Sequence, residues 1–278
     1  METTSVPQLF DPVKVSLGLE RARRIGAETF LLERMSEDLV ERLAPVMREF
    51  TILHDFGTPD GAFGKAVASA RGVTGSSIGE DFPEVETQDL IVSGFALHRV
   101  NDLPGYLTRL RRALKPDGLL IAAFAGGDTL HELRASLLAA ESEVRGSAGL
   151  RVFPMVDVRA AGQLLQRAGL ALPVADADKL TVRYDNVFAL IGDLRAMGAT
   201  ASALLRPGQP PLTRTIIARA AQIYAERFAD ADGRIRATFE IIWISGWAPH
   251  ESQQKPLKPG SAKTPLADAL AKIREEKE

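Results

Sequence analysis

Short apolar runs of strand length alternate with helix-like segments through the first half of this 278-residue chain. Two of the runs, Asp89–Ser93 and Leu119–Phe124, are apolar enough to be buried on both faces, which is typical of strands in a parallel sheet. The segment between them, Leu103–Leu114, has the length and composition of a helix. Because neighbouring parallel strands need a crossover connection, this order predicts an open α/β sheet with right-handed crossovers.

The same patterns locate the other elements of the sheet. We expect parallel strands at 51–55, 73–78, 89–93 and 119–124, and a final antiparallel strand at 239–247 because the last connection is not a simple crossover. Lys115–Gly118 is expected to be a turn, and 179–184 is a further strand candidate. Helices are predicted within 17–50 and at 62–70, 103–114, 130–145, 156–168, 188–197 and 214–228.

These elements suggest three parts of the chain. Residues 1–50 form an N-terminal helical segment, and residues 51–248 form the α/β domain, with a helical insertion at about 185–230 before its last strand. Residues 249–278 begin as a linker rich in Pro, Gly and Lys and end in a short charged tail helix. We see no internal repeat.

Composition excludes several classes of protein. A net charge of −2 provides no basic field for nucleic acid, and the lack of cysteine excludes disulfides, thiolate nucleophiles and cysteine-ligated zinc. No stretch approaches the length of apolar sequence that spans a bilayer, and the first residues lack the features of a secretory signal. We therefore expect a cytoplasmic protein without a transmembrane segment, in which peripheral attachment to the inner face of a membrane remains open.

A glycine-bearing turn follows the first predicted strand. This strand ends at Asp55, and Gly57 and Gly61 precede the next helix. In a doubly wound sheet such a turn brings backbone N–H groups close to a cofactor at the carboxyl edge. An ordinary tight connection between a strand and a helix has the same appearance, so the motif alone leaves both readings open.

Longer stretches give a more specific resemblance. Asp89–Pro104, with the sequence DLIVSGFALHRVNDLP, and Leu114–Gly118, with the sequence LKPDG, resemble the fourth strand, following helix and fifth-strand entry of class I S-adenosylmethionine (SAM) methyltransferases. Four further stretches narrow the resemblance: Gly126–Leu130, Glu132–Arg134, Asp193–Gly198 and His250–Gln253. They resemble the branch containing the biotin-pathway malonyl-acyl-carrier-protein methyltransferase and, more closely, the mitochondrial complex I assembly factors described as arginine hydroxylases.

The resemblance implies a Rossmann-like class I methyltransferase fold and a SAM site. The cofactor-binding residues would be Asp55, Gly57 and Gly61 of the first motif, together with Ser93. Pro59 stands where the family has the middle glycine of this motif, which removes an N–H donor and fixes φ.

A second departure concerns the ribose. Ser77 stands where the family has an acidic residue that holds the ribose hydroxyls. Glu80 or Asp81 would compensate only if the loop that carries them folds back.

The third departure is a shortened interval. Gly61 and Asp89 are 28 positions apart (89 − 61), whereas one strand–helix–strand unit takes roughly 30 residues or more. The family places two crossovers here, so we expect one strand and its helix, the part that walls the adenine, to be missing.

Residues after two later strands are the substrate-facing candidates. His98 follows the strand at 89–93, and Gly127, Asp128 and Thr129 follow the strand at 119–124. Structural roles are also open: His98 as a helix-entry residue bonded to a neighbouring loop, and Asp128 or Thr129 as the N-cap of the next helix.

Other chemistries are less well supported. Gly75–Gly79 matches the G-x-S-x-G hydrolase pattern with Ser77 as nucleophile, but no helix follows it. The four histidines have no metal-ligand spacing, so no metal site is predicted and the catalytic residues remain unassigned. Trp243 and Trp247 share one face of a strand and are expected in the core.

Two hypotheses follow for function. The first is a methyltransferase-family protein of the complex I assembly-factor type that acts on a protein substrate or partner, with a respiratory complex I subunit as the candidate. It would act through the cleft between the carboxyl edge of the sheet and the insertion. The second is a pseudoenzyme that keeps the fold and binding surface without SAM, which Pro59, Ser77 and the short interval favour.

Overall fold

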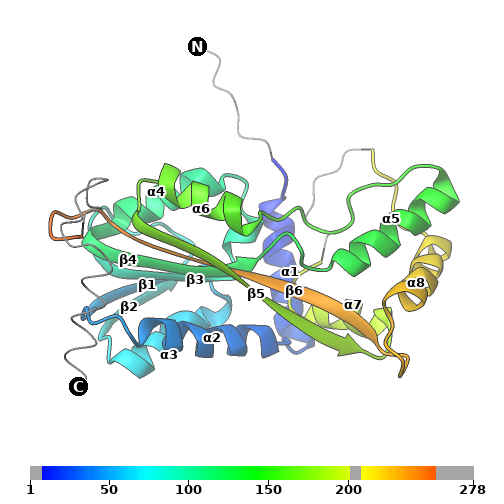
Figure 1. Ribbon diagram of the computed structural model, residues 1–278, viewed down its shortest axis with the longest axis horizontal. Coiled ribbons are helices and arrows are strands. Elements are labelled where there is room, and N and C mark those ends of the chain that lie inside the picture. The colour runs from blue at the N-terminus through cyan, green and yellow to red at the C-terminus, as the bar shows by residue number, and fades with distance from the viewer. Residues whose placement is uncertain (1–7, 201–207, 255–278) are drawn as a thin grey trace, which may run out of the picture.

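The protein is built around one twisted sheet. The computed structural model describes residues 8–200 and 208–254. Its six strands have the order β2-β1-β3-β4-β6-β5 (Figure 1). The first four pair in parallel, and β6 is antiparallel to both of its neighbours. In chain order the strands are β1 Ile52–Phe56, β2 Gly75–Gly79, β3 Gln88–Gly94, β4 Leu114–Ala125, β5 Ala171–Tyr184 and β6 Ile235–Trp247. The predicted parallel core and antiparallel last strand are confirmed.

The short interval before β3 has the expected consequence. Strand β2 is the edge of the sheet, and no further strand lies beyond it among the described residues. The chain passes from β2 to β3 through a loop of a few residues, 80–87, with no intervening helix. The prediction that this side of the sheet is one strand short is confirmed.

Two predicted boundaries were wrong. The segment Lys115–Gly118 does not end an element but forms a bulge inside β4, since Gln88 pairs with Leu114 and Leu90 with Leu119. Asp117 has φ +62° at this bulge, and its N–H donates to the carbonyl of Ala248. The turn-forming residues were identified correctly. Because the residues on both sides of them pair with β3, strand β4 continues across them.

The second difference is the length of the last two strands. Strands β5 and β6 pair from Ala171 opposite Trp247 to Tyr184 opposite Ile235, well beyond the predicted 179–184 and 239–247. Polar and proline residues at 173–178 hide the first half of β5 from a hydrophobic pattern. The paired strands extend past the other four and carry the helical insertion at their far end (Figure 1).

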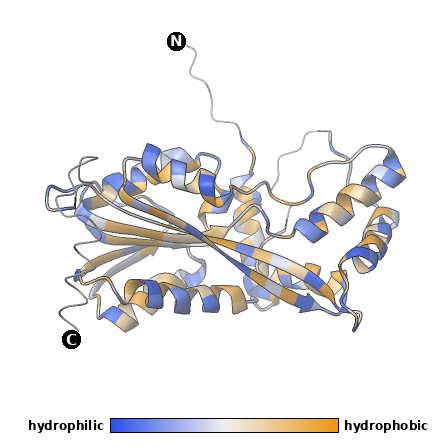
Figure 2. Ribbon diagram, in the orientation of Figure 1, coloured by the Kyte–Doolittle hydropathy of each residue, from blue (hydrophilic) through white to orange (hydrophobic). Residues whose placement is uncertain are grey.

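Helices cover both faces of the sheet. The helices α4 (Leu103–Ala113) and α6 (Val158–Arg167) lie on one face, and α2 (Phe30–Leu43) and α3 (Ala62–Arg71) on the other (Figure 1). Each pair buries its apolar side against the strands, and hydrophilic residues face outward (Figure 2). Trp243 is buried in the core on the α2 and α3 side, where Trp247 also packs, as expected.

The remaining helices form a separate group beside the carboxyl edge of the sheet. They are α1 (Pro12–Ile25), α5 (His131–Arg145), α7 (Val187–Ala196) and α8 (Arg214–Phe228). The predicted helical region 17–50 is therefore two helices, interrupted after Gly26, which has φ +90°. The predicted linker and tail helix lie mostly outside the described residues, which end at 254.

Candidate functional site at the carboxyl edge

Three loops meet where β1, β3 and β4 end. The first contains Gly57 and the short 3-10 helix η1 (Pro59–Gly61), the second contains the 3-10 helix η2 (Leu97–Arg99), and the third is 126–130. Parallel strands bring these loops to one edge because their carboxyl ends point the same way.

The glycine loop after β1 has an unusual shape. Pro59 begins η1, and Asp60 and Gly61 both have left-handed conformations, with φ +53° and +64°. Gly57 has φ +70°, and its N–H donates to the carbonyl of Gly79 at 2.9 Å. The substitution by proline therefore coincides with a helical turn in place of an open glycine loop.

The space over this loop is filled by the chain itself. A Cβ atom at Gly61 would lie 2.4 Å from Cδ1 of Ile78, and one at Gly57 would lie 2.9 Å from Cβ of Ala96. The side chains of Ile78 and Ala96 therefore rest directly on the two glycines that a cofactor would approach. As arranged here, the loop offers SAM neither these faces of the two glycines nor the N–H of Gly57, which is bonded to Gly79.

Asp55 and Ser93 make bonds within the protein. Oδ2 of Asp55 accepts from the N–H of Gly64 at 2.7 Å, and burial raises the pKa of this carboxyl to about 6. The hydroxyl of Ser93 is also buried and donates to the carbonyl of Phe56 at 2.8 Å. Both predicted cofactor residues hold the loop and helix α3 in place.

Ser77 lies in the middle of the edge strand. Its Oγ is 2.7 Å from Nδ1 of His54, its cross-strand neighbour, and Nε2 of His54 has no partner in the described part of the chain. A serine nucleophile needs a sharp strand-to-helix turn and an oriented base, and neither is present here. The hydrolase interpretation is wrong.

The loop after β2 does fold back toward the carboxyl edge. Cγ of Glu80 lies 3.7 Å from the position of a Cβ on Gly57, and its charge acts on Arg99 of η2. Glu80 therefore provides an acid near the first motif. Glu80 and Asp81 were the two residues expected to compensate for Ser77 only if their loop folds back.

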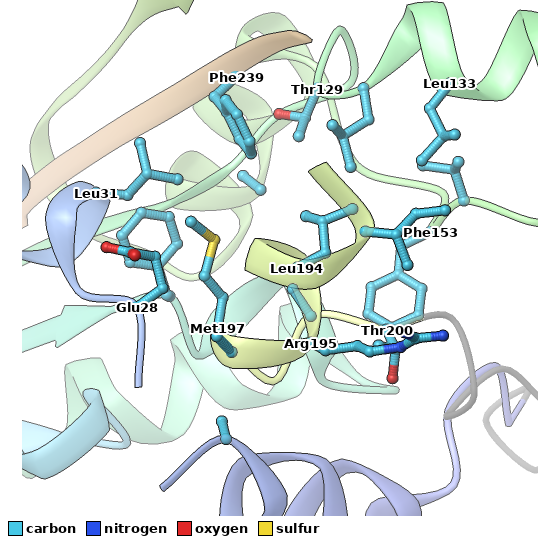
Figure 3. Close-up of a pocket in the computed structure, with 18 of the residues that line it drawn as sticks. Glu28, Leu31, Thr129, Leu133, Phe153, Leu194, Arg195, Met197, Thr200 and Phe239 are labelled. Carbon is cyan, nitrogen blue, oxygen red and sulfur yellow. The ribbon is translucent and has the colours of Figure 1, made fainter. Parts of the chain in front are cut away.

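A cavity of about 490 Å³ lies beneath the helical insertion, between α1, α2, α5, α7 and α8. Its walls are predominantly apolar, and Figure 3 shows Leu31, Leu133, Leu194 and Phe239 among the residues that line it. The predicted cofactor residues Asp55, Gly57, Gly61 and Ser93 are not part of the lining, although Pro59 and Asp60 of the glycine loop are. The open space of the site is therefore on the insertion side.

Two of the four substrate-facing candidates line the cavity and two do not. His98 and Thr129 line the cavity, whereas Gly127 and Asp128 do not. Asp128 instead forms an ion pair with Lys179. The hydroxyl of Thr129 donates to the carbonyl of Glu240 at 2.9 Å, so it links the loop to β6.

The N-cap prediction for α5 was wrong. The residue at the N-cap is Leu130, which has φ +55° and provides no side-chain hydrogen bond. The backbone N–H of Leu130 donates to the carbonyl of Thr238 at 2.7 Å, so a bond to β6 fixes the helix start.

Several charged residues in the cavity lining were not identified from the sequence, and Glu28 and Arg99 are two of them. Glu28 precedes α2, and its Oε1 accepts from the N–H groups of Thr29 and Phe30 at 3.1 and 3.3 Å. Arg99 follows His98 directly, and its Nη2 donates to the carbonyl of Phe95 at 2.7 Å. Only the position of Arg99, next to a candidate residue after a buried strand, offered a signal in the sequence.

No group of His, Asp or Glu side chains within residues 8–200 and 208–254 could hold a metal ion. Across the same ranges, no helix has both the length and the apolar character needed to traverse a bilayer.

Comparison with known proteins agrees with this architecture. Residues 64–122 match a methyltransferase domain family. A putative methyltransferase from Bacillus halodurans superposes with a TM-score of 0.50 at 13% identity, over 77% of this chain and 99% of the other, which supports the fold.

Two curated relatives match this chain over most of its length and most of their own. Zebrafish "Arginine-hydroxylase NDUFAF5, mitochondrial" is 37% identical over 87% of this chain and 72% of its own. A malonyl-[acyl-carrier protein] O-methyltransferase from Laribacter hongkongensis is 31% identical over 87% and 75%. The chain therefore belongs to the class I methyltransferase family, in the branch that contains the arginine-hydroxylase NDUFAF5 proteins.

Proposed function

We propose that this protein acts on an arginine side chain of a protein substrate, as the name of its NDUFAF5 relatives describes, with a respiratory complex I subunit as the candidate substrate. The observation that supports this proposal is the cavity between the carboxyl edge and the insertion, where a substrate cleft was expected from the sequence. The catalytic residues remain unassigned.

Glu28 is the residue we expect to recognise the substrate guanidinium. It belongs to the cavity lining together with Leu31 and Met197 (Figure 3). The apolar side chains suit the methylene stem of an arginine, and a carboxylate is the usual partner of its guanidinium. Asp60, the other acid in the lining, is already paired with Arg23 at 3.1 Å.

The filled glycine loop favours a second candidate function. A binding module that helps assemble its partner without using SAM would need the cavity and insertion but not an open cofactor loop. Ile78 and Ala96, which cover the two glycines, support this alternative. If SAM does bind, the loop must first release these contacts.

The test is complementation of a deletion strain followed by mass spectrometry of complex I subunits. Hydroxylation adds one oxygen atom to an arginine, methylation adds one CH₂ group, and a binding module restores assembly without either. We expect the parent to restore an added oxygen and Glu28→Gln to reduce it at least about tenfold, since a charged hydrogen bond is worth about 1.5–3 kcal/mol.

Glu41→Gln is the matched control, because Glu41 is an exposed acid on α2 outside the cavity lining. The amide oxygen introduced by Glu28→Gln can still accept the two N–H bonds at the start of α2, so the variant should fold. Equal modification by Glu28→Gln and Glu41→Gln would contradict the role of Glu28. Full assembly with no added mass would favour the binding module.

Location forms part of the same proposal. We place the protein in the cytoplasm, with peripheral attachment to the inner face of a membrane as the route to complex I. Cell fractionation with and without a salt wash tests this: release by salt supports peripheral attachment, and permanent absence from the membrane fraction argues against it.

A further inference from the structure

Strand β2 is an open edge of the sheet (Figure 1). All five of its residues pair in parallel with β1, and within residues 8–200 and 208–254 no other strand pairs with it. Its middle three residues, Ser76, Ser77 and Ile78, are exposed, and the exposed fraction of Ile78 is 53%. One side of β2 is therefore accessible to solvent.

The alternation of backbone groups identifies those that point away from β1. The N–H of Gly75 and the carbonyl of Gly79 bond to residues at the two ends of β1, at 3.1 and 2.9 Å. Since the backbone groups of a strand alternate between its two sides with a period of two residues, those of Ser76 and Ile78 point outward. A strand added at this edge would find two N–H donors and two carbonyl acceptors.

The opposite edge of the sheet, β5, is protected in ways that β2 is not. Strand β5 contains Pro173, and its register with β6 shifts between Ala171 and Val174. Its Asp176 and Lys179 form ion pairs with neighbouring elements. Proline, charged side chains and irregular register are the features by which edge strands resist pairing with other chains. The sequence of β2, Gly-Ser-Ser-Ile-Gly, has no proline or charge, and its register is continuous.

The loop 80–87 that leaves β2 is strongly acidic. Its four acids are all exposed: Glu80, Asp81, Glu84 and Glu86. The segment contains no Lys or Arg, and in the described part of the chain no ion pair involves any of the four.

The loop is held in place by Phe82, whose ring centroid lies 5.0 Å from those of Phe56 and Tyr106. The guanidinium of Arg109 lies over the same ring and pairs with none of the four acids. Because Glu80 directly follows Gly79, a strand added beside β2 and longer than it would pass these carboxylates.

We propose that the open edge of β2 binds an extended, Lys- and Arg-rich segment of a partner protein as an added strand. Bonds to the backbone of Ser76 and Ile78 hold the segment, and its basic side chains approach the carboxylates of loop 80–87. A second copy of this chain is a poorer fit, because it would bring the same four acids to the edge. This inference goes beyond the proposed function and rests neither on the cavity nor on arginine modification.

The direct test is fluorescence anisotropy of a labelled peptide, Arg-Thr-Val-Arg-Val-Thr-Arg, titrated with the purified full chain at low salt. We expect it to bind at least about tenfold more tightly than a matched peptide with Glu in place of each Arg. A version with N-methyl groups on two consecutive central residues keeps the charges but cannot pair along either side, so it should show a similar loss. Equal affinities of the three peptides, or no binding of the first, would overturn the proposal.

Hydrogen exchange locates the peptide on the protein. The N–H groups of Ser76 and Ile78 should exchange more slowly when the basic peptide is bound. The N–H of Gly75, which is already bonded to the carbonyl of Thr51, should not change. Protection of β5 in place of β2 would overturn the assignment of the edge.

Two substitutions at position 76 test the contribution of the backbone. Ser76→Pro removes one outward N–H and leaves the bonds to β1 in place, so it should weaken the basic peptide at least about tenfold. Ser76→Thr is the matched control, because it keeps the N–H and adds only a methyl group, and it should bind like the parent. The same affinity in both variants would contradict pairing at this edge.

Amide substitutions test the contribution of charge and keep the proposal falsifiable if Ser76→Pro fails to fold. The test variant carries three changes in the loop: Asp81→Asn, Glu84→Gln and Glu86→Gln. The control carries three changes at exposed acids outside it: Glu37→Gln, Glu41→Gln and Glu49→Gln. We expect only the loop variant to weaken the basic peptide about tenfold. An equal loss in both would show attraction to the overall charge and overturn the role of the loop.

Sedimentation velocity distinguishes a partner segment from a second copy of the chain. A dimer that Ser76→Pro dissociates would show that β2 pairs with itself, and it would overturn the proposal. Arginine modification is measured in the complementation assay and does not enter these titrations, so failure of the proposed function is distinguishable from failure of this inference.

Discussion

The loop after β1 and the loops after β3 and β4 leave the same edge of the sheet, but their surroundings differ. Around Gly57 and Gly61, the side chains of Ala96 and Ile78 approach the backbone so closely that an added Cβ would collide. Beneath α7 the chain leaves a cavity of about 490 Å³. One half of the carboxyl edge is thus packed, and the other is hollow.

This difference indicates which part of the carboxyl edge has room for a ligand. A ligand site requires open space as well as suitable side chains. The half that would hold SAM has lost a strand, an acid and a glycine, whereas the half next to the insertion keeps a large chamber with charged residues in its lining. The open space for a ligand therefore lies on the insertion side.

The largest expected effect comes from removing a side chain in the packed half. Phe63 of α3 is fully buried, and its ring stacks on Trp243 with centroids 6.0 Å apart and nearly parallel planes. We expect Phe63→Ala to lower the free energy of unfolding by about 3–5 kcal/mol in a urea titration, because a tightly packed site cannot collapse around the vacancy. A loss below about 1 kcal/mol would show that this half is not close-packed.

The second prediction uses the buried carboxyl of the packed half. Asp55 has a pKa raised from 3.8 to about 6, so its contribution to stability is present below the unfolded value and is lost as the pH rises through about 6. A rise of two units corresponds to about 3 kcal/mol. Relative to Asp55→Asn, the parent should therefore lose about 2–3 kcal/mol of unfolding free energy between about pH 4 and about pH 8.

Asp89 provides the control with the opposite sign. Its pKa is lowered to about 2 by bonds from Lys115, Thr51 and Ile52, which outweigh its desolvation. Its contribution is present above about pH 4 and is lost as the pH falls through about 2, so Asp89→Asn should destabilise the protein at neutral pH. A difference between parent and Asp55→Asn that does not change with pH would contradict the Asp55 prediction.

The third prediction concerns substitutions that should restore SAM binding to the packed half. Calorimetric titration of the parent should show much weaker SAM binding than intact methyltransferases have. The triple variant Pro59→Gly, Ser77→Asp and Ile78→Ala should tighten it by about one to two decades, because a carboxylate–hydroxyl bond is worth about 1.5–3 kcal/mol. The lost strand limits the recovery.

Ser76→Asp in place of Ser77→Asp is the matched control, since Ser76 is exposed on the opposite face of β2. Low-micromolar binding of SAM by the parent would refute the prediction that the packed half binds SAM weakly. So would a methyl transfer that Asp55→Ala and Gly57→Val both abolish.

The smallest expected effect concerns the hollow half. Leu133 of α5 is buried but borders the cavity. Leu133→Phe should change the free energy of unfolding by less than about 1 kcal/mol, since the larger ring can extend into existing space without forcing strain. A cost of several kcal/mol in a urea titration would mean that the chamber is already filled in solution.

Much of the fold could be predicted because its signals are local. The apolar runs of β3 and β4, the glycine turn after β1 and the short interval before Asp89 identified the parallel sheet and its missing strand. The bulge in β4 and the first half of β5 were missed, since pairing with β6 holds those segments extended against their own turn-forming or polar composition.

Prediction of the candidate site also succeeded for some residues and failed for others. Pattern alone identified His98 and Thr129 as residues after strand ends, and both line the cavity. It also selected Asp55 and Ser93, which bond to the protein itself. Glu28 could not be identified, because it lies about 70 residues before η2 in the sequence and enters the site only through the docking of α1 and α2.

The sequence by itself therefore determined the family, the parallel strands with an antiparallel last strand, and the departures from the family's cofactor motif at Pro59 and Ser77, because these depend on residue identity and spacing along the chain. Only the tertiary structure decided that Ile78 and Ala96 cover the glycine loop, that Glu80 folds back beside it, and that Glu28 and Arg99 line the same cavity. Burial and open space arise from contacts between segments distant in sequence, and no local pattern encodes which side chain will fill a gap or leave one.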